Sequence, residues 1–205
     1  MQSGSLTRER ILDEAAKLVL LKGIGATSVN DFLVAAGIRK GTLYYHFPGK
    51  DELVMAVLQR AKTRFVASLE EALDAPTPAD SIRRFFDMAL EVHRNQGFKG
   101  GCLFGNTCLE MSDVHQGYVD SVNDLFNTWT SRIEAVMRAG QQAGQFRTDL
   151  SAGSLAQVIV SSVEGGIMMS RLKKEEGPLK TCIESLWIFL RSEASPTKFS
   201  SPFLA

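Results

Sequence analysis

Apolar residues recur at intervals of three and four along nearly the whole chain, and this period limits the possible folds more than any other feature. Such spacing places the apolar side chains on one face of an α-helix. Glycines and prolines interrupt the pattern, and no two strand-like segments are joined by an Asn-Gly or Asp-Gly hairpin turn. The sequence therefore predicts an all-α protein.

Three short helices are predicted within the first fifty residues. The first extends from an N-cap at Thr7 to Lys22, and the second is capped by Thr27 or Ser28. Gly37 can adopt the left-handed conformation of the turn that follows. The third helix lies in "GIRKGTLYYHFPGK" and stops at the Pro-Gly pair. Further helices are predicted from Lys50 to about Leu73 and over 81–95, 101–112, 115–142, 151–173 and 178–192.

The charge is unevenly distributed along a chain whose net charge is zero. Lysine and arginine number 23, as do aspartate and glutamate, but residues 1–50 hold seven basic and four acidic side chains. This modest excess favours an anionic partner near the N-terminus. Without a run of 18 apolar residues or a signal-peptide pattern, the expected location is the cytoplasm and no membrane partner is expected.

The third helix displays side chains that suit double-stranded DNA. If Ile38, Leu43 and Phe47 are buried, the cations and hydroxyls of this segment face outward. Two short helices joined by a tight turn form a helix-turn-helix, whose second helix can enter the major groove. Arg39 and Lys40 are the candidates for guanine contacts. The complete set of predicted DNA-binding residues is Thr27, Asn30, Arg39, Lys40, Gly41, Thr42, Tyr44, Tyr45, His46 and Lys50.

Their expected roles differ. Hydroxyl and imidazole groups donate to phosphate oxygens, Lys50 adds a charge at the start of the next helix, and Gly41 lets the backbone approach the DNA. Asn30 is a candidate for a base edge. The alternative is that the aromatic residues are core and the charges only solvated.

Residues 7–54 closely resemble the DNA-binding domain of the tetracycline-repressor (TetR) family of bacterial transcription regulators. The resemblance is carried by "GIRKGTLYYHFPGKDEL" and the segment before it, "ERILDEAAKLVLLKGIGATSVNDFLVAAG". It implies a DNA-binding domain over 1–50, a helical effector-binding and dimerisation domain over 51–192, and a homodimer on a palindromic operator that a small molecule releases. Residues 193–205, with two prolines, are expected to form a flexible tail.

The last two predicted helices carry small and apolar residues on more than one face. The segments are "SLAQVIVSSVEGGIMMSRLKKEEG" and "LKTCIESLWIFLRS". Such faces fit a four-helix interface across a two-fold axis, although an ordinary intrachain core would use the same residues. The predicted interface consists of Ile159, Ser162, Val163, Gly166, Ile167, Leu186 and Phe189.

The segment "GFKGGCLFGNTCLEMSD" lacks the order of a phosphate-binding loop and no strand precedes it. It resembles a stretch that, in one branch of TetR-like regulators, opens the sixth helix beside the ligand cavity. Cys102 would lie in the first turn of that helix, where the dipole lowers the pKa of a thiol and Lys99 adds to the effect. Cys102 would then sense an oxidant or electrophile, or it would simply pack as a small buried thiol.

An effector pocket needs apolar walls and a few polar groups. The predicted pocket residues are Phe65, Phe86, Cys102, Phe104, Asn106, Met111, Trp129 and Met168, within a wider set that includes Phe85 and Met88. No paired catalytic residues, nucleotide fingerprint or metal-ligand spacing is present, so neither an enzyme nor a cofactor is expected. The hypothesis is a repressor released by an inducer, with a redox or electrophile sensor acting through Cys102 as the alternative.

Overall fold

The computed structural model describes residues 2–191, and over that range it contains helices and no strand. The all-α prediction is confirmed. The nine helices of this range are α1 (Gln2–Lys22), α2 (Val29–Ala36), α3 (Lys40–His46), α4 (Lys50–Leu73), α5 (Pro78–Asn95), α6 (Leu103–Met111), α7 (Gln116–Gln142), α8 (Ala152–Lys173) and α9 (Gly177–Arg191).

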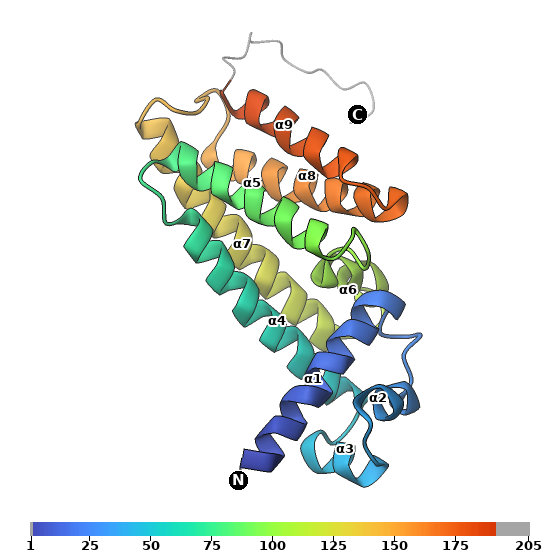
Figure 1. Cartoon of the computed structure of the whole chain (residues 1–205). Helices are drawn as coiled ribbons and strands as arrows, with labels where there is room; N and C mark the ends of the chain where they lie inside the picture. The colour runs from blue at the N-terminus through green and yellow to red at the C-terminus, as the bar shows by residue number, and fades with distance from the viewer. Residues whose placement is uncertain (1, 192–205) are drawn as a thin grey trace.

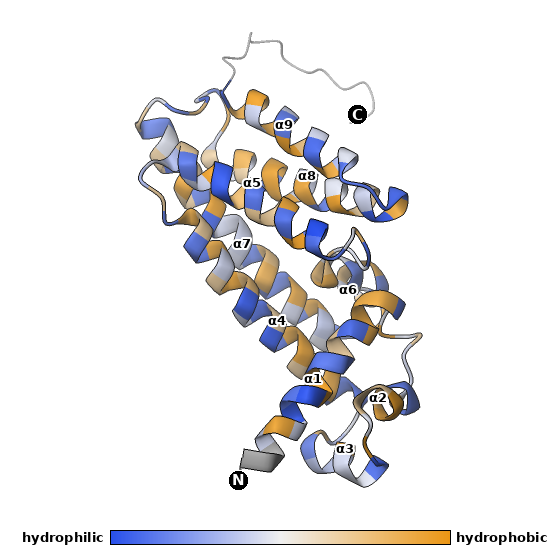
Figure 2. Ribbon diagram, viewed as in Figure 1, coloured by the Kyte–Doolittle hydropathy of each residue, from blue (hydrophilic) through white to orange (hydrophobic). Residues whose placement is uncertain are grey.

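Helices α1–α3 lie at one end of the molecule and α8 and α9 at the other, with the long helices α4 and α7 running between them (Figure 1). Bands of polar and apolar residues along the long helices follow the helical period (Figure 2). Their apolar bands meet in two clusters of buried side chains. One joins α1–α4 to α6 and α7, and the other joins α4 and α5 to α7, α8 and α9.

Two helix starts differ from the prediction. Helix α1 begins at Gln2 instead of after Thr7, because no proline interrupts the helical backbone in residues 2–6. Helix α5 begins at Pro78, within the segment expected to be a connection. Thr77 caps it by accepting a hydrogen bond from the backbone N–H of Asp80 (3.1 Å), and proline suits the first helical position because no N–H is needed there.

The N-terminal core continues into the rest of the chain. Phe104 of α6 and Tyr118 and Val122 of α7 are buried in the same cluster as Leu43 and Phe47. The three N-terminal helices therefore do not pack only on one another. The division into domains at residue 50 stays a prediction, and the predicted tail, 193–205, lies outside the described residues.

Candidate nucleic-acid interface and internal cavity

Local hydrogen bonds fix the start and end of α2. The hydroxyl of Ser28 accepts from the backbone N–H of Asp31 (3.2 Å), whose carboxylate accepts from the backbone N–H of Ser28 (2.8 Å). This reciprocal pair is a capping box. The bonds to the Ser28 hydroxyl and backbone, with a smaller effect of Lys22, lower the pKa of Asp31 to about 2. At the other end, Gly37 adopts the predicted left-handed conformation (φ 60°, ψ 42°).

Helix α3 buries one side and exposes the other. Leu43 and Phe47 are buried, as predicted, and Ile38 is half-buried. Tyr45 is 82% exposed, and Arg39, Lys40 and Gly41 are also exposed. Because a methyl group added at Gly41 would meet no atom within 4 Å, this part of α3 is open to a close partner.

The polar tips on this surface remain free to bind a partner. Within residues 2–191, no hydrogen bond or ion pair engages the side chains of Arg39, Lys40, Thr42, Tyr44, Tyr45 and His46. The ammonium group of Lys40 lies 5.8 Å from the centre of the Tyr44 ring. The rings of Tyr45 and His46 meet edge to face at 5.0 Å. Asn30 is exposed on α2, and Lys50 is half-buried in the first turn of α4.

Thr27 does not belong to this surface, and its prediction as a DNA-binding residue is wrong. Its side chain is completely buried, and its hydroxyl donates to the carbonyl of Gly23 at 2.6 Å. The threonine therefore closes the connection between α1 and α2. Ser28, the alternative considered for the cap, is the N-cap of α2.

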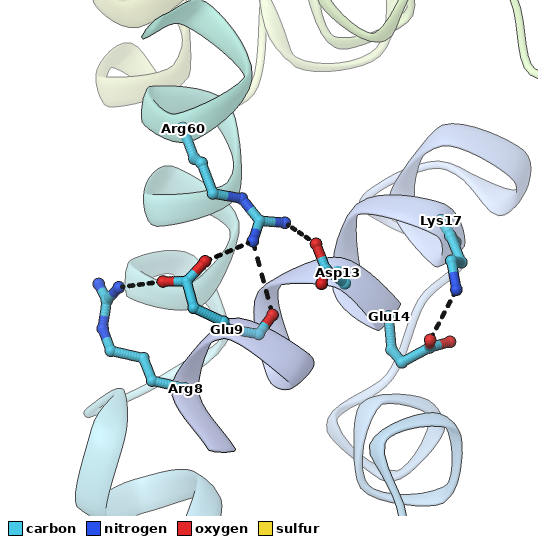
Figure 3. Close-up of polar contacts among 6 residues, drawn as sticks. All are labelled: Arg8, Glu9, Asp13, Glu14, Lys17 and Arg60. Carbon is cyan, nitrogen blue, oxygen red and sulfur yellow. Dashed lines mark hydrogen bonds and ion pairs between the residues drawn. The ribbon is translucent and has the colours of Figure 1, made fainter. Parts of the chain in front are cut away.

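An ion-pair cluster joins α1 to α4 (Figure 3). The guanidinium of Arg60, on α4, reaches Glu9 (3.0 Å) and Asp13 (2.9 Å), both on α1. Glu14 and Lys17 pair along α1 at 2.7 Å. Because Arg60 contacts two successive turns, it fixes α1 to α4 more firmly than a single surface pair would.

A second contact holds the connection between α1 and α2 against α6. The carboxylate of Glu110 accepts hydrogen bonds from the backbone N–H groups of Ile24 (2.8 Å) and Gly25 (2.5 Å). A methyl group at Gly23 would lie 2.8 Å from Glu110 Oε2, and the φ of Gly23 is +90°. Glycine is therefore required at this position for both space and backbone conformation.

The start of α4 is held by α7. The hydroxyl of Tyr118, which is fully buried, donates to the carboxylate of Asp51 at 2.9 Å. Burial, and then the hydrogen bond to Asp51, raise the pKa of Tyr118. The tyrosine therefore stays neutral and fixes the turn that carries Lys50.

Beneath these contacts lies a cavity of about 410 Å³, walled by residues of α1 and α4–α8. Arg60 lines it, as do Phe104 of α6 and Ala16 of α1. Two helices of the cavity wall, α4 and α6, therefore also contact α1.

Aromatic rings form much of the cavity wall. The ring of Trp129 meets those of Phe65 (5.0 Å) and Phe85 (5.9 Å) edge to face and stacks on Phe126 (5.8 Å). Edge-to-face and offset-stacked rings hold one another in place. This rigid apolar wall suits a compact apolar molecule.

Half of the predicted pocket residues line this cavity and half do not. That the cavity binds an effector stays a prediction. Phe65, Cys102, Phe104 and Trp129 line the cavity, together with Phe85 and Met88 of the wider set. The four that do not line it are Phe86, Asn106, Met111 and Met168.

These four have other environments. Phe86 and Met111 are buried in the protein core. Asn106 bonds to the carbonyl of Gly100 (2.7 Å) and to Arg171 (2.6 Å). Met168 is exposed.

Glu164 is the cavity residue that the sequence analysis missed. It lies on α8 in "SSVEGG", between small and apolar residues. Burial raises its pKa, and a hydrogen bond from the Cys102 thiol partly opposes this rise. A lone acidic residue within an apolar helix was the available signal, because buried carboxylates are uncommon.

The expected low pKa of Cys102 is wrong in direction. The thiol is the N-cap group of α6, and the backbone N–H of Gly105 donates to its sulfur at 3.4 Å. Burial, and then the nearby carboxylate of Glu164, raise the pKa of Cys102 well above its ordinary value. The loss of hydrating water raises the pKa of the thiol more than the start of the helix lowers it, so the thiol is protonated.

Most of the predicted dimer interface is buried inside the chain. Ile159, Val163, Ile167 and Leu186 belong to the intrachain core, as the alternative interpretation held. Gly166 faces α9, where an added methyl group would lie 3.0 Å from Leu179. Ser162 and Phe189 are half-buried.

The exposed faces of α8 and α9 carry a different set of residues. This outer apolar face consists of Val158, Met168, Met169 and Leu172 on α8 and Ile188 on α9. Gly165 lies on the same side of α8, with open space beside it.

Two further features concern the described range, a metal-binding cluster and a membrane-spanning helix. No group of three or more histidine, cysteine, aspartate or glutamate residues there is arranged to hold a metal ion. By length and composition alone, helix α8 is long and apolar enough to cross a membrane, and 44% of its apolar window is buried inside the protein.

Comparison with known families gives two matches that together span most of the chain. Residues 11–57 match the profile described as "Bacterial regulatory proteins, tetR family". Residues 78–186 match the profile described as "Tetracyclin repressor-like, C-terminal domain". The second match alone spans more than half of the chain.

Similar proteins and structures agree with these profiles. The transcriptional regulator AcuR of Cereibacter sphaeroides is 28% identical over 177 residues, which cover 85% of this chain and 81% of AcuR. The transcriptional repressor DhaR of a Mycobacterium species is 26% identical over 175 residues, covering 84% and 86%. A TetR transcriptional regulator from Chloroflexus aurantiacus has a TM-score of 0.86 at 27% identity, covering 94% of this chain and 98% of that structure.

Proposed function

This chain belongs to the TetR family of bacterial transcriptional regulators, and from that premise we propose that it is a repressor released from its operator by a small molecule. The observation that carries the proposal is the link between the two sites. Arg60 lines the cavity and holds α1, and Glu110 holds the α1–α2 connection from α6, a helix that also forms part of the cavity wall.

The proposed DNA contacts are the free polar groups of α3 and its neighbours. Arg39 and Lys40, at the start of α3, contact base edges, and Lys50 contacts a phosphate. The hydroxyls of Thr42, Tyr44 and Tyr45 and the imidazole of His46 donate to further phosphate oxygens. Asn30, on α2, is proposed to reach a base edge.

Two copies of the chain are needed for tight binding, because one short recognition helix reads only a few base pairs. We therefore propose a homodimer whose α3 helices enter successive major grooves, about 34 Å apart. The outer apolar face of α8 and α9 is the proposed interface, because its exposed side chains would be removed from water on pairing.

The effector acts by binding the two arrangements of the dimer unequally. A ligand in the cavity contacts α4 and α6, whose movement is transmitted to α1 and the α1–α2 connection through Arg60 and Glu110. It releases DNA only to the extent that it binds the non-DNA-binding arrangement more tightly. The site of action is the bacterial cytoplasm.

Reversible binding is favoured over the alternative of a redox or electrophile sensor. A protonated Cys102 thiol is a poor nucleophile, because the thiolate is the reactive form. Cys102→Ser is expected to leave release by a non-covalent inducer intact. Loss of release by every active compound in that variant would instead support covalent sensing.

The experiment that tests the function measures binding of the purified chain to its own promoter region over a range of salt concentrations. Lys50→Ala is expected to weaken binding to all DNA sequences alike and to reduce the salt slope by about 1. Lys40→Ala is expected to reduce discrimination between the operator and altered operators.

The matched control for both variants is Lys180→Ala on α9, which removes the same charge far from α3 and is expected to bind like the wild type. If Lys50→Ala and Lys40→Ala both leave DNA binding unchanged, the proposed reading surface is wrong.

A further inference from the structure

The cavity contains a donor and an acceptor that no other group satisfies. Within the described part of the chain, the buried side-chain nitrogen and oxygen atoms without a hydrogen-bond partner are Nε1 of Trp129 and Oε1 of Glu164. Both residues line the cavity, and Trp129 is only 3% exposed. Buried polar groups are almost always hydrogen-bonded, so two exceptions at one cavity call for an explanation.

No neighbouring side chain supplies the hydrogen bond that either atom lacks. The rings that surround Trp129 are those of Phe65, Phe85 and Phe126, which offer no oxygen or nitrogen acceptor. Two cations of the described range line the cavity: Arg60 is engaged by two carboxylates of α1, and no ion pair joins Arg64 to Glu164.

The position of Glu164 is accommodated by α6. A methyl group added at Gly105 would lie 2.5 Å from Oε2 of Glu164, so the glycine leaves the space that this carboxylate occupies. The Cys102 thiol, at the start of α6, also acts on this carboxylate and partly offsets the effect of burial on its pKa. Oε2 of Glu164 therefore lies against α6, while Oε1 has no hydrogen-bond partner.

We infer that the effector is an uncharged, mainly apolar ring compound carrying a hydroxyl group, which donates to Oε1 of Glu164 and accepts from the Nε1–H of Trp129. This inference rests on the proposed effector function of the cavity. The aromatic wall takes the ring, and the volume of about 410 Å³ limits the ligand to a compact molecule.

A neutral hydroxyl suits the two unpaired atoms better than a simple charged group does. An ammonium offers donors but no acceptor for Trp129, and a carboxylate offers no donor to an ionised Glu164 and is repelled by it. A hydroxyl group supplies both. Its O–H has an acceptor in Glu164 whether that side chain is ionised or protonated.

The test uses three matched probes: 2-naphthol, 2-methoxynaphthalene and 2-methylnaphthalene. The first donates and accepts, the second only accepts, and the third does neither. The chain has two tryptophans, so Trp187→Phe leaves Trp129 as the single fluorescent tryptophan, and titration of its fluorescence measures binding. We expect 2-naphthol to bind about tenfold or more tightly than 2-methoxynaphthalene, with 2-methylnaphthalene weakest.

Variants identify the atoms responsible. In the Trp187→Phe background, Glu164→Met keeps the length of the side chain and removes the acceptor, so the preference for 2-naphthol over 2-methoxynaphthalene is expected to disappear. Glu71→Met, on the exposed side of α4, is the matched control and keeps the preference. By thermal shift, Trp129→Phe is expected to reduce the stabilisation by 2-methoxynaphthalene, and Trp187→Phe is its control.

Equal binding of the three probes, no binding of 2-naphthol, or a preference unchanged in Glu164→Met would each overturn the inference. The first result would mean that ordered water already satisfies both atoms. The titrations contain no DNA, so a chain that shows the preference but binds no operator contradicts the proposed function alone. A chain that binds operator but shows no preference contradicts this inference alone.

Discussion

Glu164 illustrates how a single half-buried side chain with one buried oxygen links stability to ligand binding. Its carboxylate lies against α6 in space that Gly105 leaves free, and one of its oxygens has no partner. An unpaired buried polar group makes a fold less stable. Natural proteins therefore keep such a group mainly where it serves a function.

Replacing Glu164 by methionine is therefore expected to stabilise the unliganded protein by about 1 kcal/mol or more, since an unpaired buried polar group is lost. Burial raises the pKa of Glu164 above its ordinary value of 4.5, so the folded protein retains a proton that the unfolded chain releases. The free energy of unfolding therefore falls as pH rises above that value, until the folded pKa is passed.

Denaturant unfolding at about pH 5 and about pH 8 checks this expectation, because the advantage of Glu164→Met is expected to be larger at the higher pH. Cys102, which faces the carboxylate, also has a raised pKa, so Cys102→Ser is measured in parallel. A methionine variant less stable than the wild type at both pH values would assign Glu164 a purely structural role.

Helix α6 has nine residues and packs against both α1 and α7. Its first turn lines the cavity with Phe104, and its last turn holds the α1–α2 connection through Glu110. The two ends of one short helix therefore contact the two sites that the proposed mechanism must couple.

Glu110→Ala is expected to free the α1–α2 connection by removing the acceptor of two backbone N–H groups. The cost is about 1–2 kcal/mol, because hydrogen bonds to a charged group contribute more than neutral ones but this carboxylate is partly solvated. Hydrogen exchange at the amides of Ile24 and Gly25 is expected to become faster.

The matched control is Glu91→Ala, which removes an exposed carboxylate from α5 and should leave these amides protected. Unchanged exchange in Glu110→Ala would show that the two hydrogen bonds do not hold the connection. Coupling between the sites would then have to pass through Arg60.

For the whole molecule, the decisive feature is the outer apolar face of α8 and α9. Leu172 is 74% exposed there, and Met168, Met169, Val158 and Ile188 accompany it. A face of this kind at the end of the molecule opposite α3 is suited to pair two chains while leaving both DNA-binding ends free (Figure 1).

Leu172→Glu is expected to convert the proposed dimer to a monomer, because two like charges would be buried near the two-fold axis. Sedimentation measures the change, and operator affinity is expected to fall about 10²-fold or more as the two half-sites cease to be bound together. Leu109→Glu is the control, since Leu109 is equally apolar and exposed but lies on α6. A Leu172→Glu dimer as stable as the wild type would place the interface elsewhere.

Features set by near neighbours were predictable from the sequence. The helical period gave the all-α fold, Gly37 gave the turn before α3, and Leu43 and Phe47 followed as its buried side. The first turn of α5 shows the limit of this reasoning, because a Thr-Pro pair is compatible with both a loop and a capped helix start.

Long-range packing decided the features that were mispredicted. Helix α8 is apolar on several faces, so its period did not reveal that Ile159 and Val163 face inward while Met168 and Leu172 face outward. For Cys102, the helix terminus was visible in the sequence, but the burial that raises its pKa depends on the packing of α6 against α8.

The sequence by itself determined the helices, the tight turn and the set of donors displayed on α3, since these depend on residues within a few positions of one another. Only the tertiary structure decided that Thr27 is buried, that Glu164 faces a cavity, and that Arg60 and Glu110 connect this cavity to α1. Each of these depends on residues distant in sequence, and their contacts form only when the apolar faces of the helices pack together.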